Sequence, residues 1–151
     1  MFDEEELLAC CASPAWAAAV ARGGPYPDRA AVEAAGAAAF ATLTWDDIAQ
    51  AMSAHPRIGD PPKGDSTEAA WSRREQSAAR RSPELVEANR AYEDRFGHVF
   101  LIFASGRTED EIVAAARQRL GNDEATERRV VAGELEKIAM LRLGRLLDAL
   151  E

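Results

Sequence analysis

Helix start signals recur along nearly the whole of this sequence. Two serine–proline pairs, Ser13–Pro14 and Ser82–Pro83, each place a capping hydroxyl before a proline, an arrangement that favours the first turn of a helix. Two further segments resemble a capping box, in which side chain and backbone satisfy each other at a helix start. They are Thr44 with Asp47 and Thr108 with Glu111. Starts this frequent indicate a helical fold.

The same signals predict a series of helices with short connections. Glycines after the apolar stretches supply stop signals, and β-branched residues are too sparse to favour strands. We expect an all-α fold, a single compact multi-helix domain over residues 1–151. The expected helices cover approximately residues 4–11, 14–22, 29–42, 45–54, 66–81, 83–96, 109–120 and 123–150.

One apolar run fits this helical pattern poorly. Val99 to Phe103 is a run of five apolar residues, and its length suits either a buried strand or the start of a buried helix. Periodicity cannot separate the two. In a chain with so many helix signals we favour a buried helix or turn.

The charge distribution argues against nucleic acid or an anionic membrane as a partner. The chain has 18 basic and 26 acidic residues, a formal charge of -8, and its arginines form no basic stripe. No apolar run approaches the roughly 20 residues of a membrane span. The acidic start lacks the basic region of a secretory signal, and the two adjacent cysteines are poorly placed for a disulfide. We therefore expect a cytoplasmic protein.

The segment HPRIGDPPKGD, which begins at His55, is an unusually stiff loop. It carries three prolines and two glycines in eleven residues, and Pro56 disfavours helical geometry at the residue before it. His55 is either an ordinary loop histidine, a metal ligand or an acid/base group that titrates near neutral pH. Because only scattered aspartates, Asp60 and Asp65, accompany it, we expect no metal site here.

Two other patterns allow both a functional and a structural interpretation. Ser72, Glu75 and Gln76 share one helix face, which either collects polar groups for a site or is simply solvated. Arg142 interrupts an apolar stripe formed by Val131, Leu135, Ile138 and Leu146. It either extends along the stripe to reach water or binds a buried anion. His98, beside a helix stop and the apolar run, is expected to pack.

Five segments, taken in order, resemble the 2-oxo-4-hydroxy-4-carboxy-5-ureidoimidazoline (OHCU) decarboxylase family. They are LLACCASPAWAAAVA, HPRIGD, WSRREQ, NRAYEDRFGHVFLIFASGR and LRLGRL, and they span nearly the whole chain. The resemblance implies an all-helical, cofactor-independent carboxy-lyase that forms (S)-allantoin in urate and purine catabolism. It also implies a homodimer and functional coupling to hydroxyisourate hydrolase and a urate-oxidising enzyme.

The resemblance also implies roles for individual residues. His55 matches the catalytic histidine of the family, Glu75 matches the acidic residue beside it, and Arg142 matches a substrate-binding arginine. Other positions match substrate contacts: Pro56, Ser72, Gln76 and the backbone of Phe100, Leu101, Ile102, Phe103 and Ala104.

Two alternatives belong to other functional classes. The first is a non-catalytic ureide-binding or regulatory domain that retains the pocket, and it predicts binding without turnover. The second is a helical interaction module, which predicts neither a small-molecule pocket nor thermal stabilisation by allantoin.

Overall fold

The computed structural model describes residues 3–60, 64, 66–76 and 82–150. Within these residues the regular structure is entirely helical, which confirms the all-α prediction. The helices are α1 (Glu4–Cys10), α2 (Pro14–Arg22), α3 (Arg29–Phe40), α4 (Trp45–Met52), α5 (Thr67–Glu75), α6 (Pro83–Phe96), α7 (Glu109–Arg119) and α8 (Glu124–Leu150).

The helices begin where the capping signals predict. Ser13 and Ser82 each accept a hydrogen bond from the backbone amide three residues further on. Both expected capping boxes form, at Thr44 for α4 and at Thr108 for α7. Gly97 ends α6 in the left-handed conformation, with a φ of 80°. Local side-chain chemistry therefore sets most of the helix boundaries.

Some helices end before the predicted residue. The ends of α3 and α4 tighten, with Thr42 N donating to Ala39 O and Ala54 N donating to Ala51 O, each at 3.2 Å. Such i→i+3 bonds close a helix without continuing its α-helical ladder. The helix expected over 66–81 ends at Glu75, and the rest of that range, 77–81, lies outside the described residues.

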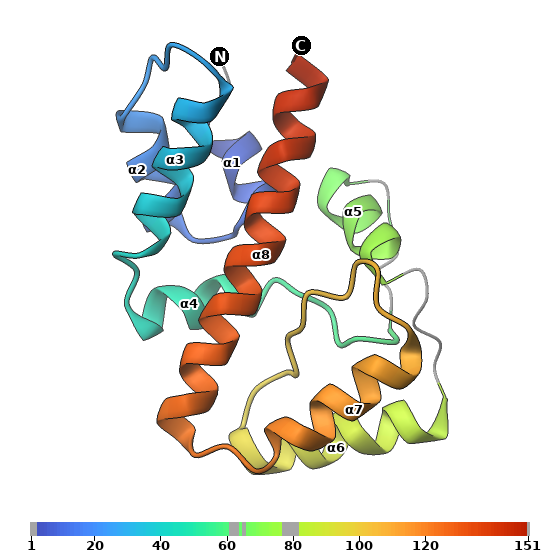
Figure 1. Ribbon diagram of the computed structural model, residues 1–151. Helices are drawn as coiled ribbons and strands as arrows, with labels where there is room; N and C mark the ends of the chain where they lie inside the picture. Colours follow the sequence, from blue (N-terminus) through green and yellow to red (C-terminus); the bar gives the residue numbers. More distant parts are fainter. Residues whose placement is uncertain (1–2, 61–63, 65, 77–81, 151) are drawn as a thin grey trace. The chain divides into compact units, whose positions relative to one another are not determined.

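The chain divides into two compact units. The first unit comprises residues 1–54 and 135–151, and the second comprises residues 55–134. Helix α8 contributes its beginning to the second unit and the remainder to the first (Figure 1). Whether residues 1–151 act as one domain stays a prediction.

The first unit packs α1 to α4 around the C-terminal part of α8. Trp16 is fully buried, and its Nε1 donates to Gly36 O at 2.9 Å. A Cβ atom at Gly36 would lie 3.0 Å from Leu143 Cδ2, so the missing side chain allows α3 to approach α8. Large apolar side chains complete this core, including Leu7, Val20, Phe40, Ile48, Leu135, Ile138 and Leu143.

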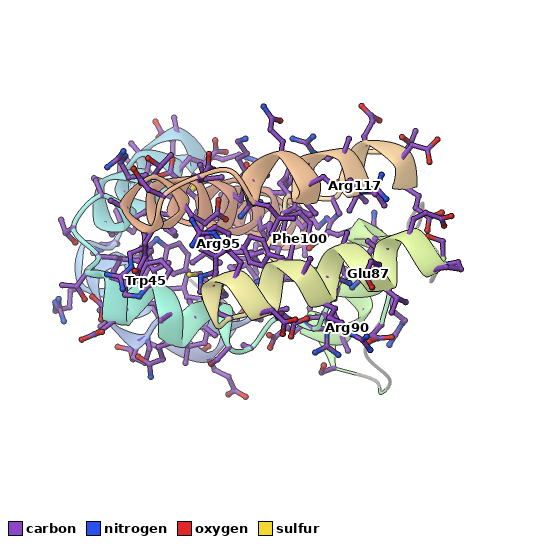
Figure 2. The ribbon with its side chains drawn as sticks, turned by 90° about the horizontal axis from the view of Figure 1, so that it is seen from below. Trp45, Glu87, Arg90, Arg95, Phe100 and Arg117 are labelled. Atoms are coloured by element: carbon purple, nitrogen blue, oxygen red, sulfur yellow. The ribbon has the colours of Figure 1, made fainter. Side chains whose placement is uncertain are left out.

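The second unit has a separate core between α6 and α7. Phe100 is buried there and lies between the two helices in Figure 2, where its ring contacts Tyr92 edge-on with centroids 5.1 Å apart. Other members of this core are Ile58, Leu85, Ala88, Ile102, Ala104, Ile112, Val113 and Ala116.

The prediction of a buried helix or turn at Val99 to Phe103 is wrong. These residues are irregular and extended, without a strand partner in the described chain. Side chains bind their backbone instead, since Arg119 Nη1 donates to Leu101 O at 2.8 Å and Phe103 N donates to Glu134 Oε1 at 3.2 Å. These two side chains supply hydrogen bonds that the buried backbone groups would otherwise lack.

A buried ion pair joins α7 to the start of α8. Arg119 Nε lies 2.9 Å from Glu127 Oε2, and the two side chains are 8% and 1% exposed. The Glu127 carboxylate also accepts hydrogen bonds from Tyr92 and Asn122. Burial alone would raise the pKa of Glu127, but these hydrogen bonds and the Arg119 charge outweigh it and hold the pKa below its ordinary value.

Replacing Glu127 with glutamine should destabilise the second unit strongly. The variant keeps the side-chain shape but leaves Arg119 buried without its counter-charge, so we expect unfolding free energy at pH 7 to fall by about 3–5 kcal/mol. Urea unfolding followed by circular dichroism measures this. Tyr92→Phe removes one hydrogen bond to the same carboxylate and should cost only about 1 kcal/mol. Equal losses in the two variants would contradict the account.

The destabilisation by Glu127→Gln should also depend on pH. A carboxyl group whose pKa is lowered by folding contributes its full stabilisation above its unfolded pKa, and this is lost as pH falls through the folded pKa. The difference between wild type and Glu127→Gln should therefore be equal at pH 7 and pH 6. It should shrink below about pH 4.3, the ordinary glutamate value. A difference that does not shrink there, in repeated urea titrations, would argue against a charge effect.

Candidate functional site

The histidine loop begins directly after the last turn of α4. His55 is half-buried, and the proline that follows it limits the backbone conformations of both residues. The next residues reach the core, because Ile58 and Gly59 are buried. The loop is therefore attached to the interior of the second unit within a few residues of His55.

The polar face of α5 is buried. Ser72, Glu75 and Gln76 are 5%, 7% and 8% exposed, whereas Arg73 and Arg74 on the opposite side are exposed. The alternative that these three polar groups form a solvated face is wrong. Burying a carboxylate is costly unless its surroundings compensate for lost water, so this face is the strongest sign of a site in the second unit.

Helix α5 and the histidine loop are joined by a hydrogen bond. Gly59 N donates to Gln76 Oε1 at 3.0 Å, and this bond is buried. From α6, Asn89 Nδ2 donates to Ile58 O at 2.9 Å. Gln76 belongs to the predicted site, but sequence reasoning missed Asn89. Its position on the apolar stripe of α6 could have indicated a buried polar side chain, because Leu85 and Tyr92 on the same stripe are also buried.

The segment after α6 contains the residues whose backbone is predicted to contact substrate. Phe100, Leu101, Ile102 and Ala104 are buried, and Phe103 is half-buried. The carbonyl of Leu101 and the amide of Phe103 are used internally, and Arg107 Nε donates to the carbonyl of Phe103 at 3.0 Å. The amide of Phe103 therefore has no hydrogen left for a ligand, whereas each of the two carbonyls can accept a second hydrogen bond.

Arg142 belongs to the first unit, whereas the other predicted site residues belong to the second. It is 1% exposed, and its Nη1 donates to Ala9 O at 3.3 Å, near the end of α1. The alternative that Arg142 extends along the stripe into water is wrong. Its four stripe neighbours, Val131, Leu135, Ile138 and Leu146, are buried as predicted.

Other reactive groups have structural environments. Burial raises the pKa of Cys10 to about 12 and that of Cys11 to about 11, so both thiols stay protonated at neutral pH. His98 Nδ1 lies 3.0 Å from Val99 O, and its ring packs against Tyr92 and Phe96. The expected packing role of His98 is confirmed.

In residues 3–60, 64, 66–76 and 82–150, no three histidine, cysteine or carboxylate side chains gather as metal ligands. Every helix in this part of the chain is too short or too polar to span a bilayer. A groove of about 330 Å³ lies between the loop residues Arg57, Ile58 and Asp60 and residues 85–94 of α6, with Asn89 in its lining. Its described lining contains no predicted substrate contact.

Known proteins resemble this chain over most of its length. The OHCU decarboxylase family model matches residues 3–144. A uric acid degradation bifunctional protein of Arabidopsis thaliana is 35% identical over 152 residues, which cover 95% of this chain and 47% of that protein. A 2-oxo-4-hydroxy-4-carboxy-5-ureidoimidazoline decarboxylase of Haloferax volcanii is 33% identical over 97 residues, 62% of this chain and 58% of the relative. The chain thus spans about half the length of these curated relatives.

Solved structures show the same fold. A crystal structure of OHCU decarboxylase in the presence of (S)-allantoin aligns with a TM-score of 0.80 and 31% identity, covering 97% of this chain and 99% of that one. A crystal structure of (S)-allantoin synthase, at 21% identity and a TM-score of 0.64, covers 93% of this chain and 48% of the other and supports the fold. With the family model matched from residue 3 to residue 144, this chain belongs to the OHCU decarboxylase family.

Proposed function

We propose that this chain is a carboxy-lyase that converts OHCU to (S)-allantoin in urate degradation, without a cofactor. The observation that carries the proposal is the buried polar face of α5, where Ser72, Glu75 and Gln76 are all less than 10% exposed. Its hydrogen bond to the loop that begins at His55 links the two parts of the predicted site. Family membership supports the same reaction.

The chemistry of OHCU explains why positioned side chains could suffice. Cleavage of the bond to the carboxylate releases carbon dioxide and leaves the electron pair on the ring carbon. The adjacent C=N bond of the ring can delocalise that pair to give an enol. The enol hydroxyl then loses its proton and becomes a ring carbonyl, while a proton adds to the neighbouring carbon that carries the ureido group. The protein must hold the carboxylate, stabilise the developing charge and direct the proton to one face. These are tasks for fixed polar groups in a site that excludes water.

We assign the proton transfers to His55 and the orientation of its ring to Glu75. Histidine titrates close enough to neutral pH to donate and accept protons. A buried carboxylate nearby favours the protonated form of an imidazole through opposite charge. Pro56 reduces the number of backbone conformations from which His55 must be selected, which lowers the entropic cost of alignment.

Arg142 and the remaining polar groups would hold the substrate. A guanidinium presents a planar fork of donors that suits a carboxylate or a ureido oxygen. Ser72, the amide nitrogen of Gln76 and backbone groups of Phe100 to Ala104, with Pro56, would contact the rest of the polar ring. The amide oxygen of Gln76 is already bound by Gly59 N, so its nitrogen is the part assigned to substrate.

We further propose that residues 1–151 act as one cytoplasmic domain that forms a homodimer. Coupling to hydroxyisourate hydrolase and a urate-oxidising enzyme would supply the unstable substrate. Relatives named uric acid degradation bifunctional protein occur in Arabidopsis thaliana and in a Bacillus species, which supports a link between steps of urate degradation.

The direct test generates OHCU in place from urate with urate oxidase and hydroxyisourate hydrolase and follows the product by circular dichroism. We expect wild type to form optically active (S)-allantoin rapidly. His55→Ala should lose about 10²–10⁴-fold in rate, the usual contribution of an acid/base group. Ser53→Ala, at an exposed residue of the same turn, is the matched control and should keep wild-type activity. Binding of allantoin without turnover by wild type would instead support a ureide-binding domain.

Arg142→Lys should weaken substrate binding. Lysine keeps the charge but cannot reproduce the planar fork, so we expect KM to rise at least about tenfold, or about 1.4 kcal/mol. Arg29→Lys is the matched control, because Arg29, like Arg142, donates to a backbone carbonyl of another helix, in this case Gly144 O of α8, but its side chain is 37% exposed. Steady-state kinetics and thermal melting of both variants make the comparison. An unchanged KM for Arg142→Lys, or an equal rise for Arg29→Lys, would remove Arg142 from the substrate site.

A further inference from the structure

The peptide group between Ile58 and Gly59 is bound on both sides by side-chain amides. Its carbonyl accepts from Asn89 Nδ2 at 2.9 Å, and its N–H donates to Gln76 Oε1 at 3.0 Å. Asn89 lies within α6 and Gln76 caps the end of α5, so two different helices hold one peptide plane. Both hydrogen bonds are buried.

This arrangement permits a single orientation of the peptide plane. Rotating the plane would separate both backbone atoms from their partners and break two buried hydrogen bonds. Gly59 has a φ of 90°, a conformation that side-chain-bearing residues rarely adopt. Together with the fixed φ of Pro56, the bound peptide leaves few free torsions between His55 and the core.

A third attachment of the loop is weaker. Arg57 forms two hydrogen bonds with Glu93, each at 2.7 Å, but these side chains are 51% and 27% exposed. Exposed ion pairs are screened by water and contribute little to holding a conformation. The buried amides therefore dominate the attachment of the loop to α5 and α6.

Asn89 is unfavourable for stability at its position. It lies among the buried apolar residues Leu85, Ala88 and Tyr92 on the inner face of α6. Its Oδ1 is buried and has no hydrogen-bond partner within the described residues. Leucine has a similar size and would remove this unsatisfied acceptor, although it would leave Ile58 O without its donor. What asparagine provides and leucine cannot is the donor to Ile58 O.

We propose that Asn89 and Gln76 are positioning residues that hold the Ile58–Gly59 peptide and thereby place His55 for proton transfer. The proposal rests on the function proposed above and adds Asn89 to its machinery. It also gives the two ends of the Gln76 amide different roles. Oε1 holds the loop, and Nε2 contacts the substrate. Asn89 acts only through the loop and does not touch the reacting atoms.

The decisive variant is Asn89→Leu, assayed for kcat, KM and thermal melting with substrate generated in place. We expect kcat to fall at least about tenfold, since small misplacements of a reacting group are costly. KM should stay within about twofold of wild type, and the melting temperature should stay close to that of wild type, because the variant removes the unpaired Oδ1 but leaves Ile58 O without a donor. Arg90→Leu, at the exposed neighbouring residue, should change none of these values. Wild-type kcat in Asn89→Leu would overturn the proposal, as would a fall in kcat that only follows a lower melting temperature.

Variants of Gln76 separate its two parts and remain informative if Asn89→Leu fails to fold. Gln76→Glu keeps an acceptor for Gly59 N but loses the amide donor, so KM should rise while the loop stays in place. Gln76→Met loses both functions, so kcat should fall as well as KM rise. Identical kinetics for the two variants would show that the acceptor is irrelevant and would contradict the proposal.

Hydrogen exchange of the Gly59 amide tests the loop attachment independently of activity. The amide should exchange slowly in wild type and in Gln76→Glu, and at least about tenfold faster in Gln76→Met. Fast exchange in wild type would overturn the proposal. If the wild-type protein is inactive but its Gly59 amide is protected, the proposed function is wrong. The positioning role of Asn89 and Gln76 in catalysis is then wrong as well, although the two hydrogen bonds to the Ile58–Gly59 peptide are still present.

Discussion

The ion pair between Arg119 and Glu127 is the interaction on which the second unit most depends. Arg119 binds the Glu127 carboxylate, donates to Leu101 O, and lies 4.7 Å from the Phe100 ring centroid. Through Tyr92, the same carboxylate is connected to α6. One buried pair thus connects three helices and an extended segment. Its charges are costly to bury, but removing either partner alone is costlier still.

The extended segment explains why such a pair lies in an otherwise apolar core. Residues 99–104 have no strand beside them in the described chain, so their backbone cannot be satisfied by a sheet. Arg119, Arg107 and Glu134 supply the missing donors and acceptors. The histidine loop follows the same rule, since side-chain amides bind its buried peptide. Both irregular segments that carry predicted site residues are therefore held by polar side chains, most of them from neighbouring helices.

This difference between local and distant interactions decides what the sequence reveals. Caps at Ser13 and Ser82 act over three residues, so the starts of α2 and α6 are predictable. The bond from Arg119 to Leu101 spans 18 residues and that from Asn89 to Ile58 spans 31. The partners in such bonds cannot be read from local spacing, which is why the apolar run was wrongly predicted to be a buried helix or turn. The apolar stripe of α6 indicates that Asn89 is buried but does not identify its partner. Spacing did place Ser72, Glu75 and Gln76 on one face, but only the structure shows that this face is buried.

The central claim is that this buried polar face and the fixed histidine loop perform a decarboxylation. Carbon dioxide release tests it most directly, measured by membrane-inlet mass spectrometry while OHCU is generated continuously from urate. The initial rate of release should rise in proportion to the concentration of this protein until substrate supply becomes limiting. Release at the spontaneous rate, whatever the protein concentration, would contradict the claim.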